Sequence, residues 1–140
     1  GVIRGWSYKP FEFSYYVYGD LDVGKMNNTA RILFEYTDFT SFSKTGTQVR
    51  TNDCRISYAR WEESGSMLIF TITADRFLRN MVRAIVGTLL DIGRGMLDED
   101  GFRRIIENKN RSDAGYSVPA CGLFLENIDY PEEIFAGNSI

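Results

Sequence analysis

The sequence predicts an α+β fold, in which an antiparallel or mixed sheet carries helices packed on one of its faces. A β-rich aromatic segment near the start, a hairpin pattern in the middle and amphipathic helical spacing in three other segments support this class. Strands mixed with helices, with a last strand near the end, favour helices gathered on one side of the sheet. At 140 residues and 44% hydrophobic content, the chain is expected to form one domain over residues 1–140.

The first expected elements are a strand and a helix. Residues 12–18 are rich in aromatic side chains and predict a strand. Apolar residues then recur with the spacing of one helix face, so a helix is expected from Val23 to Phe34 or Glu35. Asp20 or Asp22 can serve as its N-cap. The apolar face consists of Val23, Met26, Ala30, Leu33 and Phe34.

A loop and a hairpin follow. Residues 36–44 are dense in hydroxyl and turn-forming residues, so they predict a packed loop anchored by Phe39 and Phe42. The hairpin is expected to consist of a first strand, a turn at residues 62–66 and a second strand at residues 67–74. In the first strand, alternation in period two places three side chains on one face: Cys54, Ile56 and Tyr58.

The last third of the chain predicts two helices and a closing strand. Asp75 is a suitable N-cap for a helix over residues 76–92, which Gly93 and Gly95 can end. A shorter helix over residues 99–108 is expected after Asp98 as its cap, with Phe102, Ile105 and Ile106 buried. Residues 122–130 predict the final strand.

The helix predicted at residues 76–92 has a cationic side. Its helical projection places seven apolar residues on one face and Arg76, Arg79 and Arg83, with Asn80 and Gly87, on the other. That side fits either a solvated basic surface or a site for phosphate or carboxylate. Glycine inside a helix costs about 1 kcal/mol relative to alanine, so Gly87 indicates close approach of another backbone or a ligand, or tight packing on the sheet.

Composition narrows the classes of function. The net charge of −3 and the pI near 5.0 argue mildly against a nucleic-acid binder, although the position of the cations matters more than their sum. No apolar run approaches the roughly 20 residues of a membrane span, so a cytoplasmic location is expected. Cys54 and Cys121 are too few for a disulfide framework, and no histidine is present to complete a metal site. Both are expected to be buried thiols, and no cofactor or metal is expected.

Four segments, in order, resemble motifs of the tRNA pseudouridine synthase A (TruA) family. Residues 77–87 (F-L-R-N-M-V-R-A-I-V-G) resemble the family's F-L-x-x-M-V-R-x-I-V-G motif. Residues 21–33, beginning L-D and including Met26, resemble its L-D-x-x-x-M helix, and residues 38–42 (D-F-T-S-F) its D-F-x-S-F loop. Residues 111–125 (R-S-D-A-G-Y-S-V-P-A-C-G-L-F-L) resemble its R-x-x-A-G-x-x-x-P-A-x-G-L-x-L segment. The resemblance covers nearly the whole chain and corresponds to the C-terminal half of the catalytic domain.

The resemblance implies a function and a set of site residues. It implies isomerisation of uridine to pseudouridine at positions 38–40 of the tRNA anticodon arm, by a homodimer without cofactor or metal. Arg83 matches the active-site arginine that pairs with the nucleophilic carboxylate, and Gly122 and Leu123 match the pair that packs against the target base. Leu123 also fits an ordinary strand core. Arg79 and Asn80 occupy positions where histidines are common in the family, and with Arg76 they are expected to contact tRNA.

Two parts of the family's active site have no match in this chain. These are the R-T-D-x-G-V-H-A loop, which holds the nucleophilic aspartate, and the tyrosine that stacks on the base. Asp113 sits in a similar five-letter string, R-S-D-A-G, but Tyr116 and Ser117 do not continue it as V-H-A. The alternative role is a loop aspartate that binds backbone amides in a turn. The 140-residue chain alone is therefore expected to be inactive and to need the N-terminal half of its enzyme. A non-catalytic RNA-binding module and a dimerisation domain are the alternatives.

Overall fold

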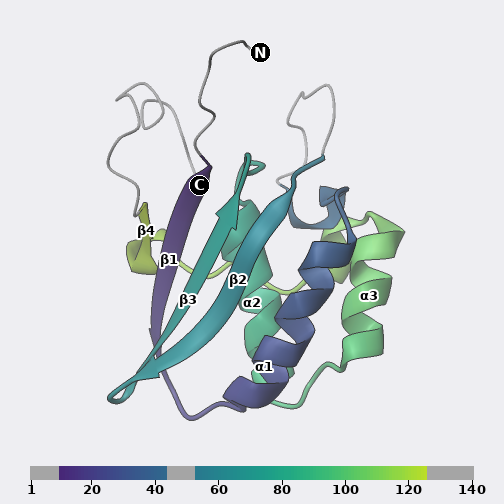
Figure 1. Cartoon of the computed structure of the whole chain (residues 1–140). Helices are drawn as coiled ribbons and strands as arrows, with labels where there is room; N and C mark the ends of the chain where they lie inside the picture. Colours follow the sequence, from purple (N-terminus) through teal and green to yellow (C-terminus); the bar gives the residue numbers. More distant parts are fainter. Residues whose placement is uncertain (1–9, 44–52, 126–140) are drawn as a thin grey trace.

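In the computed structural model, which describes residues 10–43 and 53–125, a four-stranded sheet is packed against helices (Figure 1). The strands are β1 (Phe11–Tyr18), β2 (Ile56–Ser64), β3 (Met67–Ala74) and β4 (Leu123–Leu125), in the order β2-β3-β1-β4. Every neighbouring pair is antiparallel. The helices are α1 (Val23–Ala30), α2 (Met81–Gly93) and α3 (Glu99–Asn108). The α+β prediction is confirmed, and the sheet is purely antiparallel.

The two faces of the sheet differ in burial. Inward side chains of the central strands, such as Phe13, Tyr15 and Phe70, are buried together with most of α2. In Figure 1 the strands lie in front of α2, and the face toward the viewer carries no helix over β1 and β3. Four aromatic side chains on this outward face are exposed: Tyr16, Tyr18, Tyr58 and Phe124. In the described part of the chain, the core therefore lies on one side of the sheet only, and the other side is open.

A β-bulge changes the predicted alternation in β2. The pairing register with β3 shifts between Ile56 and Tyr58. Cys54 and Ile56 are buried as expected, but Tyr58 points outward and is 41% exposed, while Ala59 and Trp61 are buried. The alternation predicted through Tyr58 is therefore wrong, because the bulge adds one residue to this strand. β2 also continues to Ser64, so the turn is shorter than predicted and contains Gly65 in the left-handed region (φ 63°).

The first helix and the loop after it agree with the prediction except at Phe34, which was expected on the apolar face and is 46% exposed, because this last turn is a 3-10 helix that buries Ile32 and Leu33 instead. Asp22 is the N-cap, and its carboxylate accepts a hydrogen bond from the backbone N–H of Lys25 at 3.0 Å. α1 ends at Ala30 and continues as a 3-10 helix over Arg31–Glu35, which matches the predicted end. In the loop, Phe39 and Phe42 are fully buried, which confirms them as anchors. Lys44 lies outside the described residues.

The predicted start of α2 is wrong. The helix begins at Met81, five residues later than expected, so Arg76, Arg79 and Asn80 are not on it. Asp75 does not cap a helix, because its carboxylate accepts the backbone N–H of Arg55 at 2.8 Å. Two further features prevent helix at residues 76–80: the Phe77 ring packs edge-on against Phe13 at 5.3 Å, and Asn80 has φ 70°. The cationic helix face predicted from the sequence is therefore reduced to Arg83.

The remaining elements match in part. α3 has the predicted bounds, the predicted cap Asp98 and the predicted buried residues Phe102, Ile105 and Ile106. β4 confirms the start of the last strand, while its predicted continuation at residues 126–130 lies outside the described residues. Cys54 is buried as expected, but Cys121 is exposed, because it lies in a 3-10 turn, Ala120–Gly122, that buries none of its residues. Among the described residues, no helix has the length and apolar character required to cross a membrane.

Candidate active site

The residue before the first turn of α2, Asn80, has a strained backbone conformation. Asn80 is the N-cap in the left-handed conformation, and its side chain does not cap the helix. The side-chain amide donates instead to the hydroxyl of Ser117 at 2.5 Å. A non-glycine residue with positive φ costs about 1–3 kcal/mol and persists only where its surroundings hold it. The Asn80–Ser117 contact is such a constraint, and it ties the start of α2 to a distant loop.

That loop, residues 114–118, lies directly on α2. A Cβ atom at Gly87 would lie 1.7 Å from the backbone oxygen of Tyr116, so only glycine permits this approach. The backbone N–H of Gly115 donates to the hydroxyl of Thr88 at 2.9 Å, one residue further along the helix. The close backbone approach expected at Gly87 is therefore confirmed.

Arg83 is held by the same loop through two hydrogen bonds. Its side-chain Nε donates to the carbonyl of Val118 at 2.7 Å, and its backbone carbonyl accepts the N–H of Val118 at 3.1 Å. The guanidinium is planar, so fixing Nε fixes the direction in which its terminal nitrogens face. A guanidinium oriented in this way at a helix N-terminus suits a carboxylate or phosphate, because the side-chain charge and the helix dipole have the same sign.

An apolar wall stands beside this arginine. Leu123 pairs with Tyr15 in the sheet, and both side chains face the helices. Gly122 lies against the same ring, since a Cβ there would come within 2.8 Å of it. The Tyr15 hydroxyl donates to the carbonyl of Pro119 at 2.7 Å. Burial raises the pKa of this hydroxyl and the nearby Cys121 thiol adds to the increase, while the charge of Arg83 partly opposes them. Pro119 directly follows Val118, whose carbonyl holds Arg83, so adjacent residues connect the wall to the arginine.

The structure thus brings together four of the six residues predicted for the site. Arg83, Asn80, Gly122 and Leu123 all contact or adjoin the segment from residue 114 to β4. Arg79 is exposed in the turn that precedes α2. Arg76 points elsewhere, because its guanidinium donates to the carbonyl of Asp53 at 3.2 Å, next to the start of β2. The prediction that Arg76 and Arg79 share a helix face with Arg83 is wrong, because neither residue is helical.

Comparison with known proteins identifies the family. A family model described as tRNA pseudouridine synthase matches residues 36–131, which is more than half of the chain. The chain belongs to the tRNA pseudouridine synthase family. Its relatives include proteins named tRNA pseudouridine synthase A from Bacteroides thetaiotaomicron, 58% identical over 128 residues, and Clostridium acetobutylicum, 42% identical over 116 residues.

These relatives are about twice as long as the matched region. The alignments cover 89% and 82% of this chain but only 48% of each relative. A third relative, from Parabacteroides distasonis, is 57% identical over 124 residues, which are 89% of this chain and 49% of that protein. The chain therefore spans about half the length of the curated relatives it matches.

Asp113, the aspartate in the string that imitates the family's catalytic loop, occupies a turn. It ends the 3-10 helix Arg111–Asp113 and is exposed. Its carboxylate accepts a hydrogen bond from the side-chain amide of Asn108 at 3.3 Å, at the end of α3. The partner is a side-chain amide and not the backbone amides expected for the alternative role.

Three residues of the site were not predicted from the sequence. Tyr15 looks like any inward aromatic residue of a strand, and only the fold shows that its hydroxyl binds the carbonyl of Pro119, the residue after the one that holds Arg83. Arg111 and Ser117 belong to a segment that resembles a family motif, but nothing in the sequence shows that they bind each other at 2.8 Å. A polar pair six residues apart in a loop carries no periodic signal, so these contacts required coordinates.

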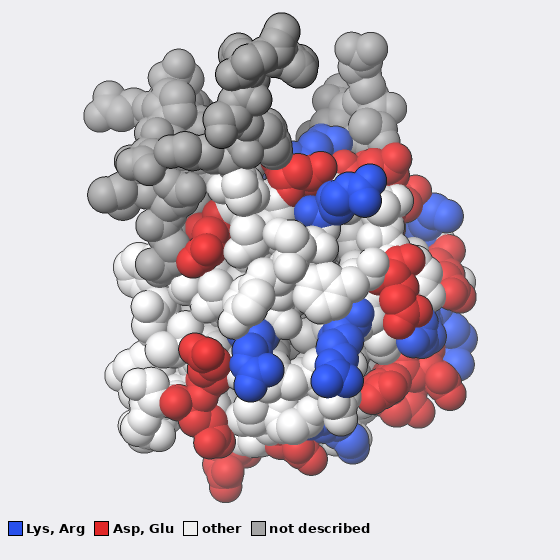
Figure 2. Space-filling model, viewed as in Figure 1, with Lys and Arg blue, Asp and Glu red and all other residues white. Residues whose placement is uncertain are grey.

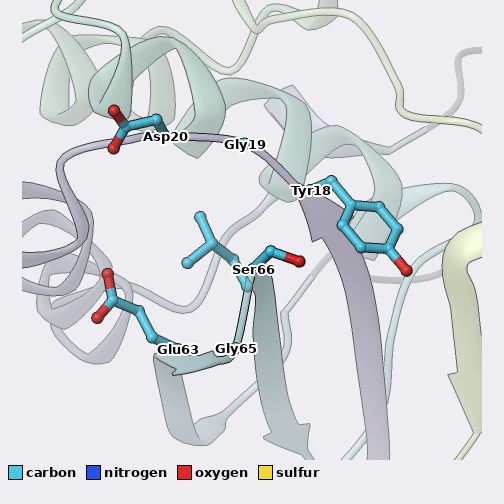
Figure 3. Close-up of a pocket in the computed structure, with 7 residues that line it drawn as sticks. Tyr18, Gly19, Asp20, Glu63, Gly65 and Ser66 are labelled. Atoms are coloured by element: carbon cyan, nitrogen blue, oxygen red, sulfur yellow. The ribbon is translucent and has the colours of Figure 1, made fainter.

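A hollow at the other end of the sheet differs in chemistry. It is lined by Tyr18, Asp20 and Glu63 with the β2–β3 turn, at the end of the sheet opposite to that from which β3 leads into α2 (Figure 3). Its two carboxylates, with no Lys or Arg among the described residues that line it, make it unsuited to phosphate. Figure 2 shows that uncharged side chains cover most of the outward sheet face and that Lys and Arg do not merge into one basic patch there.

Proposed function

We propose that this chain is the half of a tRNA pseudouridine synthase that supplies the arginine and the apolar wall of the uridine site. The observation that carries the proposal is the Arg83 side chain, held by Val118 next to Gly122 and Leu123. The family membership supports tRNA as the substrate and uridine-to-pseudouridine isomerisation as the reaction. Positions 38–40 of the anticodon arm are the proposed targets.

The proposed reaction divides the chemistry between the two halves. The rest of the protein supplies an aspartate nucleophile, and the target base leaves its stack at a cost of a few kcal/mol. Arg83 pairs with that carboxylate and lowers its pKa, so the aspartate stays ionised. The aspartate adds covalently, the carbon–nitrogen glycosidic bond breaks, and the uracil rotates. A carbon–carbon bond to the same ribose then forms, the ring carbon loses its proton, the ring nitrogen freed from the ribose gains one, and the aspartate is released. The reaction is an isomerisation with no net oxidation, so it requires no cofactor.

Gly122 and Leu123 are proposed to hold the ring of the base. An apolar wall positions a ring without offering hydrogen bonds that compete with those of the productive orientation. The half-buried Leu123 side chain and the exposed turn before it leave this wall accessible from the Arg83 side. Asn80 orients the loop that holds Arg83, and Arg79 is a candidate contact to the tRNA backbone from the exposed turn. For Arg76, the contact with Asp53 supports a structural role.

The test is pseudouridine formation on unmodified tRNA by the full-length parent enzyme. Arg83→Ala should lower turnover by roughly a thousandfold or more with unfolding stability close to wild type, because the electrostatic partner of the nucleophile is lost. Arg60→Ala is the matched control, since Arg60 is an exposed arginine on the open face of the sheet and should leave turnover unchanged. Normal turnover in a folded Arg83→Ala enzyme would show that Arg83 is a surface charge without a role in catalysis.

A second assay separates the proposal from its alternatives. The purified 140-residue chain is expected to form no pseudouridine, because the proposed nucleophile lies in the other half. Turnover by this chain that Asp113→Ala abolishes would assign the chemistry to Asp113. Binding of tRNA by the chain alone would favour an RNA-binding module, and self-association alone would favour a dimerisation domain. A homodimer, a single domain over residues 1–140 and a cytoplasmic location stay predictions; the exposed aromatic residues of the open sheet face support self-association.

A further inference from the structure

The Val118 carbonyl orients Arg83, so the position of that carbonyl matters for the site. The loop before it is held at three points: Gly115 by Thr88, Tyr116 by its contact with Gly87, and Ser117 by Asn80. None of these contacts spans the loop itself. A loop held only from the helix side can still change its internal shape and carry the Val118 carbonyl with it.

Arg111 spans the loop from within. One terminal nitrogen of its guanidinium donates to the carbonyl of Gly115 at 3.1 Å, and the other donates to the hydroxyl of Ser117 at 2.8 Å. Both acceptors are neutral, and the side chain is half-buried. The fork of the guanidinium matches two acceptors that are two residues apart, which a single ammonium group cannot bind in the same way.

We propose that Arg111 is a positioning residue for Arg83. Its two hydrogen bonds fix the path of residues 115–117, and this places the carbonyl of Val118 where it holds the Arg83 Nε. The inference rests on the proposed function, because it gives Arg111 a role only through the active-site arginine. Arg111 touches neither the substrate nor the nucleophile in this scheme.

The hydroxyl of Ser117 strengthens the case, because two elements share it. It binds Arg111 from inside the loop and Asn80 from the start of α2. Arg111 is thereby connected to the left-handed residue that sets the first turn of α2, three residues before Arg83. The arginine site thus has two supports, one through the Val118 carbonyl and one through the helix start, and both pass through contacts of Arg111.

A double-mutant cycle in the full-length parent enzyme tests this role. Arg111→Met is expected to lower kcat by roughly 10- to 100-fold with KM for tRNA within about twofold, because misplacing a catalytic group by about 1 Å has effects of this size. Arg111→Lys should recover little, because charge without the fork does not restore both bonds. In an Arg83→Lys background, which keeps charge but lacks Nε, Arg111→Met should have almost no further effect on kcat.

Three results would overturn the proposal. If the Arg111→Met loss in kcat persists at full size in the Arg83→Lys background, Arg111 acts independently of Arg83. A rise in KM with unchanged kcat would make Arg111 a direct tRNA contact. Near-wild-type kcat in a folded Arg111→Met enzyme would remove the role altogether.

Melting temperatures and further variants serve as controls for the double-mutant cycle. The melting temperature should shift by the same amount in both backgrounds, which separates the effect on turnover from any effect on folding. If Arg111→Met does not fold, Ser117→Ala, which removes one of the two acceptors, takes its place with the same expected dependence on Arg83. Failure of the proposed function would be visible separately, as normal turnover in the Arg83→Ala enzyme, which would also leave Arg111 with nothing to position.

Discussion

Gly87 is the position at which the docked loop can be tested most directly. In Gly87→Ala, the new methyl group would lie 1.7 Å from the oxygen of Tyr116, so loop and helix must separate by about 1.7 Å to reach an ordinary van der Waals contact. This separation would break or stretch the hydrogen bond of Gly115 to Thr88 and both bonds between Arg83 and Val118. At about 1 kcal/mol each, the loss is roughly 3 kcal/mol. Alanine returns about 1 kcal/mol of helix propensity, so we expect a net destabilisation of about 2 kcal/mol.

Two measurements on the full-length parent enzyme check this expectation. Urea unfolding reports the stability. The single-turnover rate of pseudouridine formation reports the orientation of Arg83, and this rate should fall by at least about tenfold. Gly24→Ala is the control, because a Cβ at this exposed helical glycine meets no atom closer than 3.7 Å. It should gain up to about 1 kcal/mol. A Gly87→Ala enzyme with wild-type stability and turnover would refute the docking of the loop on α2.

Two further predictions concern the core. Phe102→Ala removes a fully buried ring that packs against Phe42 with centroids 6.0 Å apart, so urea unfolding should show a loss of about 3–5 kcal/mol, and a loss below 1 kcal/mol would contradict this packing. Burial raises the pKa of the Cys54 thiol from 9.0 to about 12. Between these values the folded state keeps a proton that the unfolded state releases, so the free energy of unfolding should fall as the pH rises from about 9 towards 12. Cys54→Ala should flatten this part of the stability profile while Cys121→Ser should not, and equal slopes in all three proteins would refute the assignment.

Local signals predicted those elements whose causes are local. α3 has its cap, its helical spacing and its buried face within eleven residues, and its bounds agree with the prediction. The prediction of the start of α2 was wrong because the contacts that determine where the helix begins come from residues far away in the sequence. Arg55 binds the Asp75 carboxylate and Phe13 packs on Phe77, and neither contact leaves a trace in the segment itself. Tertiary contacts outweighed helix propensity in this segment.

The candidate site also has one part that the sequence predicted and one part that it did not. A motif resemblance was enough to select Arg83, Gly122 and Leu123, and the structure shows that Arg83 binds Val118, in the segment that leads to the other two. Resemblance does not explain how the arginine is held, because that depends on bonds between backbone atoms and side chains of separate elements. The Val118 carbonyl and the Arg111 fork are of this kind. The resemblance therefore selected the candidate site residues, while the contacts that hold them could be found only in the structure.

The strand order also determines when the site can exist during synthesis. Tyr15 on β1 binds the carbonyl of Pro119, 104 residues later, and β1 pairs with β4 only after that point. At roughly 5–20 residues per second, a ribosome needs on the order of ten seconds to make the intervening chain. During this interval β1 has no β4 to pair with. Arg83 has been synthesised, but the loop that holds it has not. Among the described elements the arginine site is thus completed last, so a nascent chain that ends before residue 115 contains the α2 residues but not the loop that holds Arg83.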